Sequence, residues 1–286
     1  MIKSILFSLL FVSGLNAFNI EIVNTTVQNG KTTLVEFEKE KNIAFIELSL
    51  DDKKYKIFNH PTNDKKMYAL LPISYYAKPR DINVTLTYRE NGTPAVKTLL
   101  FNIEDGNYEK ETLKVDNAKV DLNAKDKKRA ALETKETLKI YNTINKKSYI
   151  KSEFIFPMSS KITSAFGRAR VYNETLKGYH SGTDFRAKVK TPIKASNDGV
   201  VVLAKDRFYS GGSIILDHGQ GIYTCYFHMS QMNVKAGEKI KKAQIIGLSG
   251  KSGRVTGPHL HFSARVNGVQ VDPMQLISLM NTKLLK

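Results

Sequence analysis

Two short segments in the C-terminal half of the chain combine imidazole and carboxylate side chains at spacings suited to binding a metal ion. The first is His180–Asp184, which reads HSGTD. Side chains alternate between the two faces of an extended segment, so His180 and Asp184 lie on the same face. Gly182 has no Cβ, so the backbone between them can bend or approach another segment closely. One divalent ion could therefore contact both side chains.

The second segment is His259–Phe262, which reads HLHF. On a strand, this spacing places His259 and His261 on one face and turns Leu260 to the other. Two histidines and one aspartate, with a position left for water, are typical of catalytic zinc, whereas structural zinc has four protein ligands. The single cysteine of the chain, Cys225, cannot supply the thiolates of a structural site. The spacing therefore favours a catalytic metal site.

A third segment, Thr224–His228, reads TCYFH and is also predicted to be a strand. Strict alternation places His228 on the same face as Tyr226 and places Cys225 and Phe227 on the opposite face. We therefore interpret Cys225 as a small buried residue rather than a nucleophile. His228 is expected to emerge into a cleft, where its imidazole is free to act.

Two further histidines are interpreted as having no chemical role. His218 falls in the sequence DHGQG, which is typical of a hairpin turn between strands at 214–216 and 222–224. His60 is the only histidine before residue 151 and stands beside Pro61 in an expected turn.

Together these motifs resemble those of the lysostaphin-type zinc metallopeptidases. His180–Asp184 resembles the HxGxD motif of that family, and Gly257–Phe262 resembles its GPHLHF motif. The segments GSIILDHG at 212–219 and YFHM at 226–229 resemble the intervening strands, in the same order. The resemblance covers about residues 156–273 and implies an all-β catalytic domain built on an antiparallel sheet.

The resemblance also implies roles for particular residues. His180, Asp184 and His261 would bind one Zn²⁺ per catalytic domain, and His228 and His259 would be unligated catalytic histidines. Of these two, we expect His259 to act as the base and His228 to stabilise the oxyanion. Tyr172 and Tyr179 are both candidates for the tyrosine that the family uses near the first ligand. The sequence departs from the family pattern at Ser263, where an acidic residue is common, and at Met229, where leucine is common.

The function implied by this resemblance is hydrolysis of peptide cross-links in peptidoglycan, most simply as a D,D-endopeptidase in cell-wall remodelling. Two alternatives stay open. One is a D,D-carboxypeptidase that trims stem peptides. The other is a non-catalytic protein that binds the cell wall and regulates other hydrolases, although all five motif residues of an enzyme are present.

The composition, with 41% hydrophobic and 25% charged residues, is that of an ordinary globular protein, and 286 residues suggest about two domains. The net charge is +17, and residues 151–286 hold 20 Lys and Arg against 8 Asp and Glu. Such a charge favours polyanionic partners. No motif spacing points to nucleic acid, so we expect peptidoglycan as substrate and peripheral association with wall polymer or membrane. No specific protein partner is indicated.

The start of the chain indicates export. A basic residue, Lys3, precedes an apolar run at 5–12, and Leu15–Ala17 resembles a cleavage site for a secretory signal peptide. An uncleaved N-terminal anchor is the alternative. No cysteine follows the apolar run, which argues against a bacterial lipid anchor. We therefore predict a signal peptide over 1–17 and a periplasmic mature protein, which could also associate with the cell envelope.

The remainder of the chain is predicted to form three units: a β-sandwich-like module over 18–115, a helical linker over 116–150, and the metallopeptidase domain over 151–286. Alternating apolar residues separated by turn signals predict short strands in the first unit. These strands are expected at 19–23, 33–37, 43–48, 54–58, 82–88 and 97–101. A charged run without glycine or proline predicts a helix over 125–141 in the second unit.

Overall fold

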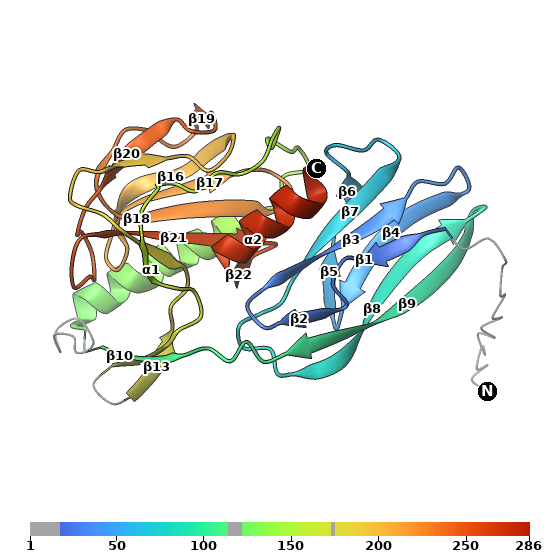
Figure 1. Cartoon of the computed structure of the whole chain (residues 1–286), viewed down its shortest axis with the longest axis horizontal. Helices are drawn as coiled ribbons and strands as arrows, with labels where there is room; N and C mark the ends of the chain where they lie inside the picture. Colours follow the sequence, from blue (N-terminus) through green and yellow to red (C-terminus); the bar gives the residue numbers. More distant parts are fainter. Residues whose placement is uncertain (1–17, 114–121, 173–174) are drawn as a thin grey trace, which may run out of the picture.

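The computed structural model describes residues 18–113, 122–172 and 175–286. The predicted signal peptide at 1–17 lies outside these residues. Residues 116–121 of the predicted linker also lie outside them. Within the described ranges, no helix is both long and apolar enough to cross a membrane. Figure 1 shows a strand-rich N-terminal part and a second, larger body of strands that carries both described α-helices.

The N-terminal part contains two sheets that pack face to face. The four-stranded sheet has the order β1 (Ile20–Ile22), β3 (Thr32–Glu38), β7 (Lys66–Pro72) and β6 (Phe58–Asn59). The five-stranded sheet has the order β2 (Thr26–Gln28), β9 (Thr93–Glu104), β8 (Arg80–Glu90), β4 (Ile43–Leu50) and β5 (Lys53–Tyr55). Their inner faces share one apolar core, so the predicted sandwich-like arrangement is present.

Two details of the predicted strands differ from the structure. The expected strand at 54–58 is divided between β5 and β6, which belong to different sheets. Strand β7 was not predicted. Its apolar run at 69–71 lacks the alternation of apolar and polar residues that a strand with one solvated face shows. The reason is that β7 is buried on both sides.

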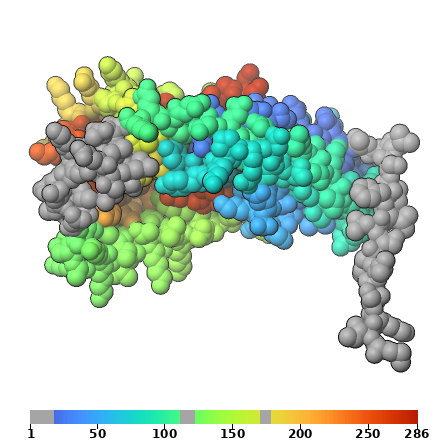
Figure 2. All heavy atoms as spheres, turned by 90° about the horizontal axis from the view of Figure 1, so that it is seen from below, coloured from blue at the N-terminus to red at the C-terminus, as the bar shows by residue number. Residues whose placement is uncertain are grey.

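The four-stranded sheet contributes to two cores. Leu34 on β3 pairs with Leu70 on β7, and both lie in the core of the C-terminal body. The adjacent residues Val35 and Leu71 point the other way, into the sandwich. The N-terminal strands and the C-terminal body therefore pack directly against each other, as Figures 1 and 2 show.

The C-terminal body is built on a ten-stranded sheet whose paired strands are all antiparallel. Its main order is β11 (Ile162–Ser164), β14 (Thr183–Arg186), β21 (His259–Val266), β18 (Ile222–Met232), β17 (Gly211–Asp217), β16 (Gly199–Arg207) and β19 (Lys239–Ile240). Strands β15 (Pro192–Lys194), β20 (Ile245–Ser249) and β22 (Val269–Val271) attach beside this path. The predicted all-β catalytic domain is confirmed.

Helical segments cover parts of both faces of this sheet. Helix α2 (Pro273–Leu279) and the π-helical turn η2 (Met280–Leu284) contribute to the same core as Leu260 and Phe262. Helix α1 (Ala124–Tyr141) confirms the predicted connecting helix, and its Asn123 cap accepts a hydrogen bond from the Asp126 backbone N–H. Tyr141, at its end, packs on the opposite face beside Cys225.

A small three-stranded sheet joins the two parts of the chain. Strand β10 (Lys110–Leu113), which follows the N-terminal sandwich, pairs in parallel with β12 (Ala169–Tyr172). Strand β12 forms a hairpin with β13 (Thr175–Tyr179), and β13 runs directly into His180. A segment that follows the N-terminal sandwich is thus paired with the hairpin that leads into the first candidate metal ligand. Figure 1 shows β10 beside β13.

Candidate active site

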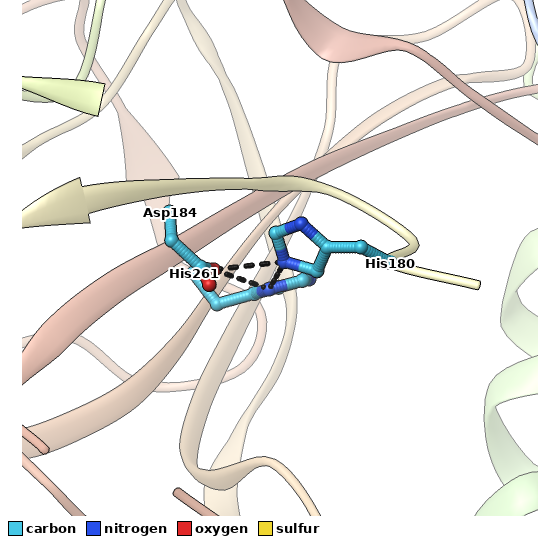
Figure 3. A group of neighbouring side chains, drawn as sticks. All are labelled: His180, Asp184 and His261. Carbon is cyan, nitrogen blue, oxygen red and sulfur yellow. Dashed lines mark hydrogen bonds and ion pairs between the residues drawn. The ribbon is translucent and has the colours of Figure 1, made fainter. Parts of the chain in front are cut away.

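Three candidate ligands meet in one buried cluster. His180 Nε2 lies 2.9 Å from Asp184 Oδ1 and 3.0 Å from His261 Nδ1, and the last two atoms are 2.9 Å apart. Figure 3 shows the three side chains pointing toward one another from two neighbouring chain segments. Strands β14 and β21 pair so that Asp184 is directly opposite His261, which brings together residues 77 positions apart. The prediction that His180 and Asp184 share a face is therefore confirmed, as is the same prediction for His259 and His261, since both of these rings lie near Asp184.

The backbone around His180 fixes which ring nitrogen faces the cluster. Its Nδ1 lies 2.8 Å from the carbonyl oxygen of Ala165, which can only accept a hydrogen bond, so Nδ1 carries the proton. In the neutral ring Nε2 then presents a lone pair to the Asp184 carboxylate. In the neutral ring these two acceptors repel each other unless a proton or a metal ion lies between them. The cluster therefore fits a metal ion, and the donor set agrees with the predicted metal cofactor.

The carboxylate of Asp184 is held in its charged form. Burial alone would raise the pKa of Asp184, but hydrogen bonds and charge interactions with His180 and His261 outweigh burial and hold the pKa well below its usual range. At neutral pH the cluster thus offers one anionic oxygen and two imidazole nitrogens.

Gly182 allows the first motif to lie against β21. A Cβ at this position would lie 2.4 Å from the carbonyl oxygen of Phe262 and 2.6 Å from His261 Nε2. Only glycine fits here without moving backbone atoms, which bears out the expected close approach.

His259 stands at the rim of the cluster, at the first residue of β21. Its Nδ1 donates to the carbonyl oxygen of Gly257 at 2.9 Å, so Nε2 is the unprotonated nitrogen of the neutral ring. This Nε2 lies 3.7 Å from Asp184 Oδ1, and the side chain is 18% exposed. The imidazole is therefore next to the three donors and open to solvent.

The position of His228 corrects the sequence prediction. Strict alternation placed it on the face of Tyr226, which lies in the core shared with Leu260. Instead, the pairing of β17 with β18 shifts at this point, and His228 has a φ of +62°. This β-bulge turns the ring toward the metal cluster, with its centroid 4.9 Å from that of His259 and 5.9 Å from that of His261.

His228 resembles His259 in how its ring is held. Its Nδ1 donates to the carbonyl oxygen of Ser252 at 2.9 Å, so its Nε2 is also unprotonated in the neutral ring. Burial, together with the charges of His261 and His259, lowers the pKa of His228 to about 3. The carbonyls of Ala165 and Ser252 were not found from the sequence, because any residue type can supply a backbone carbonyl.

The aromatic residues of the predicted segments pack beside the cluster or against the N-terminal part. Phe227 stacks on His261 with ring centroids 5.7 Å apart. Tyr179 stacks on Tyr75 of the N-terminal sandwich, and its pKa is raised to about 12, chiefly by burial. The side chain of Tyr172 lies outside the described side chains.

His218 and Cys225 are structural, as the sequence indicated. His218 follows β17 in the expected turn and is fully buried; its Nδ1 donates to the carbonyl oxygen of Asp198 and its Nε2 accepts from the Thr224 hydroxyl, both at 2.7 Å. Burial lowers the pKa of His218 to about 4. The Cys225 thiol is buried, and burial raises its pKa, so it is not a nucleophile.

The antiparallel sheet presents a buried His–Asp–His cluster beside the imidazoles of His228 and His259, a donor set that suits a catalytic metal ion. Residues 178–273 match the family model of Peptidase family M23. This part of the chain is thus similar to that family, and the predicted resemblance to lysostaphin-type peptidases is confirmed.

Known relatives match part of the chain. The Vibrio cholerae protein named peptidoglycan DD-endopeptidase ShyA is 42% identical over 123 residues, which are 42% of this chain and 29% of that protein. The catalytic domain of lysostaphin from Staphylococcus simulans is 36% identical, over 42% of this chain and 92% of that domain, with a TM-score of 0.38. The chain thus spans less than a third of the length of ShyA.

One solved structure resembles most of the chain. A Pseudomonas aeruginosa protein assigned to peptidase M23 covers 88% of this chain and 95% of its own, with 24% identity and a TM-score of 0.67. At this identity the likeness concerns the fold, which includes the N-terminal sheets as well as the catalytic body.

Proposed function

We propose that the protein is an exported zinc metallopeptidase that hydrolyses peptide cross-links of peptidoglycan, with His180, Asp184 and His261 as the zinc ligands. The observation that carries this proposal is the convergence of three donor atoms within 3.0 Å, with the His180 ring oriented by the Ala165 carbonyl. The substrate class follows from the name of the 42% identical relative, a peptidoglycan DD-endopeptidase.

The two unligated histidines perform the proton transfers in this proposal. When bound, zinc supplies Lewis-acid chemistry: it polarises a carbonyl and lowers the pKa of water toward about 7. His259 accepts the proton of the attacking water at Nε2 and returns it to the leaving amine. We assign this role to His259 because its ring is next to the donors and reaches solvent.

His228 stabilises the oxyanion that develops on the scissile carbonyl. Because its Nδ1 is engaged with Ser252, it can donate to the oxyanion only when Nε2 also carries a proton. Its Nε2 would take up this proton from solvent as negative charge develops in the transition state, although burial lowers the pKa of the free ring. Removal of His228 should therefore affect the chemical step more than zinc binding.

The proposed location is the periplasm, where peptidoglycan lies. The predicted signal peptide supports export, and the net charge of +17 supports peripheral association with anionic wall polymer or membrane. Salt would weaken such an association, because surface charges are screened over about 8 Å at physiological ionic strength.

Digestion of purified sacculi tests the activity. The protein would be incubated with sacculi alone, with a chelator, and with the chelator followed by zinc, and the released muropeptides would be separated. An endopeptidase converts cross-linked dimers to monomers, and the chelator stops this conversion until zinc is restored.

Other outcomes distinguish the alternatives. Loss of the terminal residue from pentapeptides, with dimers intact, would identify a D,D-carboxypeptidase. Retention on sacculi without any change in muropeptides would identify a non-catalytic wall-binding protein. A His261→Ala variant is the control, because it should bind sacculi without hydrolysing them.

A further inference from the structure

A cluster of four aromatic rings joins the N-terminal sandwich to the segments that flank His180. We call Tyr75, Tyr108, Phe166 and Tyr179 the bridging cluster. Tyr75 stacks on Tyr179 with ring centroids 3.8 Å apart and planes 7° from parallel, and Tyr108 lies edge-on to Phe166 at 6.0 Å. Tyr75 also contacts Tyr108, and Phe166 contacts Tyr179, at 5.1 and 5.6 Å. Each ring therefore contacts at least two others.

The sandwich holds its side of the bridging cluster through the Asn29-Gly30 turn. The Tyr108 hydroxyl donates to the carbonyl oxygen of Asn29 at 2.6 Å, and the Asn29 side chain accepts from the Gly106 backbone N–H at 2.9 Å. Gly30 has a φ of +80°, and a Cβ there would lie 2.7 Å from both Phe166 and the Tyr108 hydroxyl. The turn thus touches both rings and leaves no room for a side chain.

The catalytic side of the cluster lies on the segment that holds His180. Gly167 is directly beneath Tyr108, since a Cβ at 167 would lie 2.1 Å from that ring. The Gly167 N–H donates to the carbonyl of His180, and the His180 N–H donates to the carbonyl of Arg168, both at 2.8 Å. The carbonyl of Ala165 orients the His180 ring. One short segment therefore fixes both the backbone and the imidazole of His180.

Contacts beyond the rings extend this attachment. The Ala169 N–H donates to the carbonyl of Glu109 at 2.9 Å, and the Glu109 carboxylate pairs with the Arg168 guanidinium at 3.0 Å. Strand β10 continues the pairing along β12. Glu109 and β10, which follow Tyr108, thus pair with the segment that begins at Arg168, whose carbonyl accepts from the His180 N–H.

We propose that Tyr75 and Tyr108 are positioning residues for the metal site, so that the N-terminal sandwich is part of the support of the first zinc ligand. This inference rests on the proposed zinc site. Among the described residues, the contacts of these two rings lead toward the donor cluster through Phe166, Gly167 and Tyr179. Their packing restricts the segment 164–168, and thereby the direction of His180 Nε2. Groups that orient a ligand in this way affect metal affinity without contacting the metal.

Leucine variants test the proposal in the full-length protein. Tyr108→Leu and Tyr75→Leu each remove an aromatic contact, whereas Tyr108→Phe keeps the ring and loses only the hydroxyl. Tyr88→Leu is the matched control, because the Tyr88 ring packs against Phe18 within the sandwich, at 4.9 Å. Zinc affinity would be measured by competition with a chromogenic chelator. Amide hydrogen exchange of Gly167 and His180 would be measured in metal-free protein.

We expect both bridging-cluster leucine variants to bind zinc roughly 10-fold more weakly, the lower end of the range for groups that orient metal ligands. They should also exchange the Gly167 and His180 amides faster. Tyr108→Phe should remain close to the parent in both measurements. Tyr88→Leu should leave zinc affinity and these two amides unchanged even where it lowers the melting temperature.

Two results would overturn the proposal. Parent-like zinc affinity and exchange in the leucine variants would show that the rings do not position His180. Equal weakening by Tyr88→Leu would show an effect of sandwich stability alone. If Tyr108→Leu does not fold, Tyr75→Leu gives the same test, because the Tyr75 ring stacks directly on Tyr179, the residue before His180. If the parent binds no zinc, the proposed metal function fails, whereas the exchange rates still show whether the rings hold the segment around His180.

Discussion

Gly182 faces His261 so closely that a Cβ at position 182 would lie 2.6 Å from the Nε2 atom of that imidazole. The carbonyl oxygen of Phe262 would be closer still, at 2.4 Å. The segment between His180 and Asp184 therefore lies flat on β21, which allows both side chains to meet His261.

Substitution of Gly182 by alanine should disrupt the metal cluster. The added methyl group must push β21 or the His261 ring aside, and overpacking of this kind costs about 1–3 kcal/mol. We expect Gly182→Ala to lose zinc on dialysis and to lower the melting temperature, measured by elemental analysis and calorimetry. Ser181→Ala, which adds no atom to the same segment, is the control. Parent-like zinc content in Gly182→Ala would mean that this contact does not constrain the site.

Removal of a proposed ligand should remove the metal. His261→Ala leaves two donors, which are too few for a tight zinc site, so zinc content and hydrolysis should fall together. His259→Ala is the matched control, because it removes an imidazole from the same strand that is not a proposed ligand. Full zinc retention by His261→Ala would make the ligand assignment wrong.

The two unligated histidines should be separable from metal binding. Loss of a general acid or base lowers the rate roughly 10²- to 10⁴-fold. We expect this loss in His259→Ala and His228→Asn, with zinc still bound. Asparagine is the substitution at 228 because it tolerates the φ of +62° better than alanine does. If either variant digests sacculi at the parent rate, the histidine that it replaces is not catalytic.

His218 should make the fold less stable in mild acid. The folded-state pKa is lowered to about 4 by burial, whereas an exposed histidine titrates near 6.5. As the pH falls from 6.5 toward 4, the unfolded chain binds a proton that the folded chain does not, so the free energy of unfolding decreases, by up to about 3 kcal/mol. At pH 7 and above this loss is absent.

Urea unfolding at several pH values checks this expectation. His218→Gln cannot titrate, so its free energy of unfolding should fall less steeply between pH 6.5 and 4 than that of the parent. The other histidines contribute equally to both proteins. Identical slopes would rule out His218 as the source of acid sensitivity.

Much of the site could be predicted from local spacing. The face shared by His259 and His261, and the pairing of His180 with Asp184 across Gly182, follow from side-chain alternation within a few residues. The burial of Cys225 follows from the same rule, and the turn at His218 follows from the glycine-rich sequence DHGQG. These features depend on neighbouring residues, and a strand pattern determines them wherever the strand lies.

Relations between distant residues were decided by the tertiary structure. Asp184 meets His261 because β14 and β21 pair in one particular register. His228 faces the donors because a bulge and a left-handed backbone conformation reverse the alternation, and no residue type in the segment signals that reversal.

The contact of Tyr75 with Tyr179 depends on the packing of the sandwich against the catalytic body. Each of these aromatic residues alone resembles an ordinary core or surface tyrosine. Residues 104 positions apart come together only when two separate hydrophobic faces are buried against each other, and the net gain of that burial is a property of the whole fold. The local pattern therefore determined which side chains could act, and the packing of the sheets decided which of them are held together.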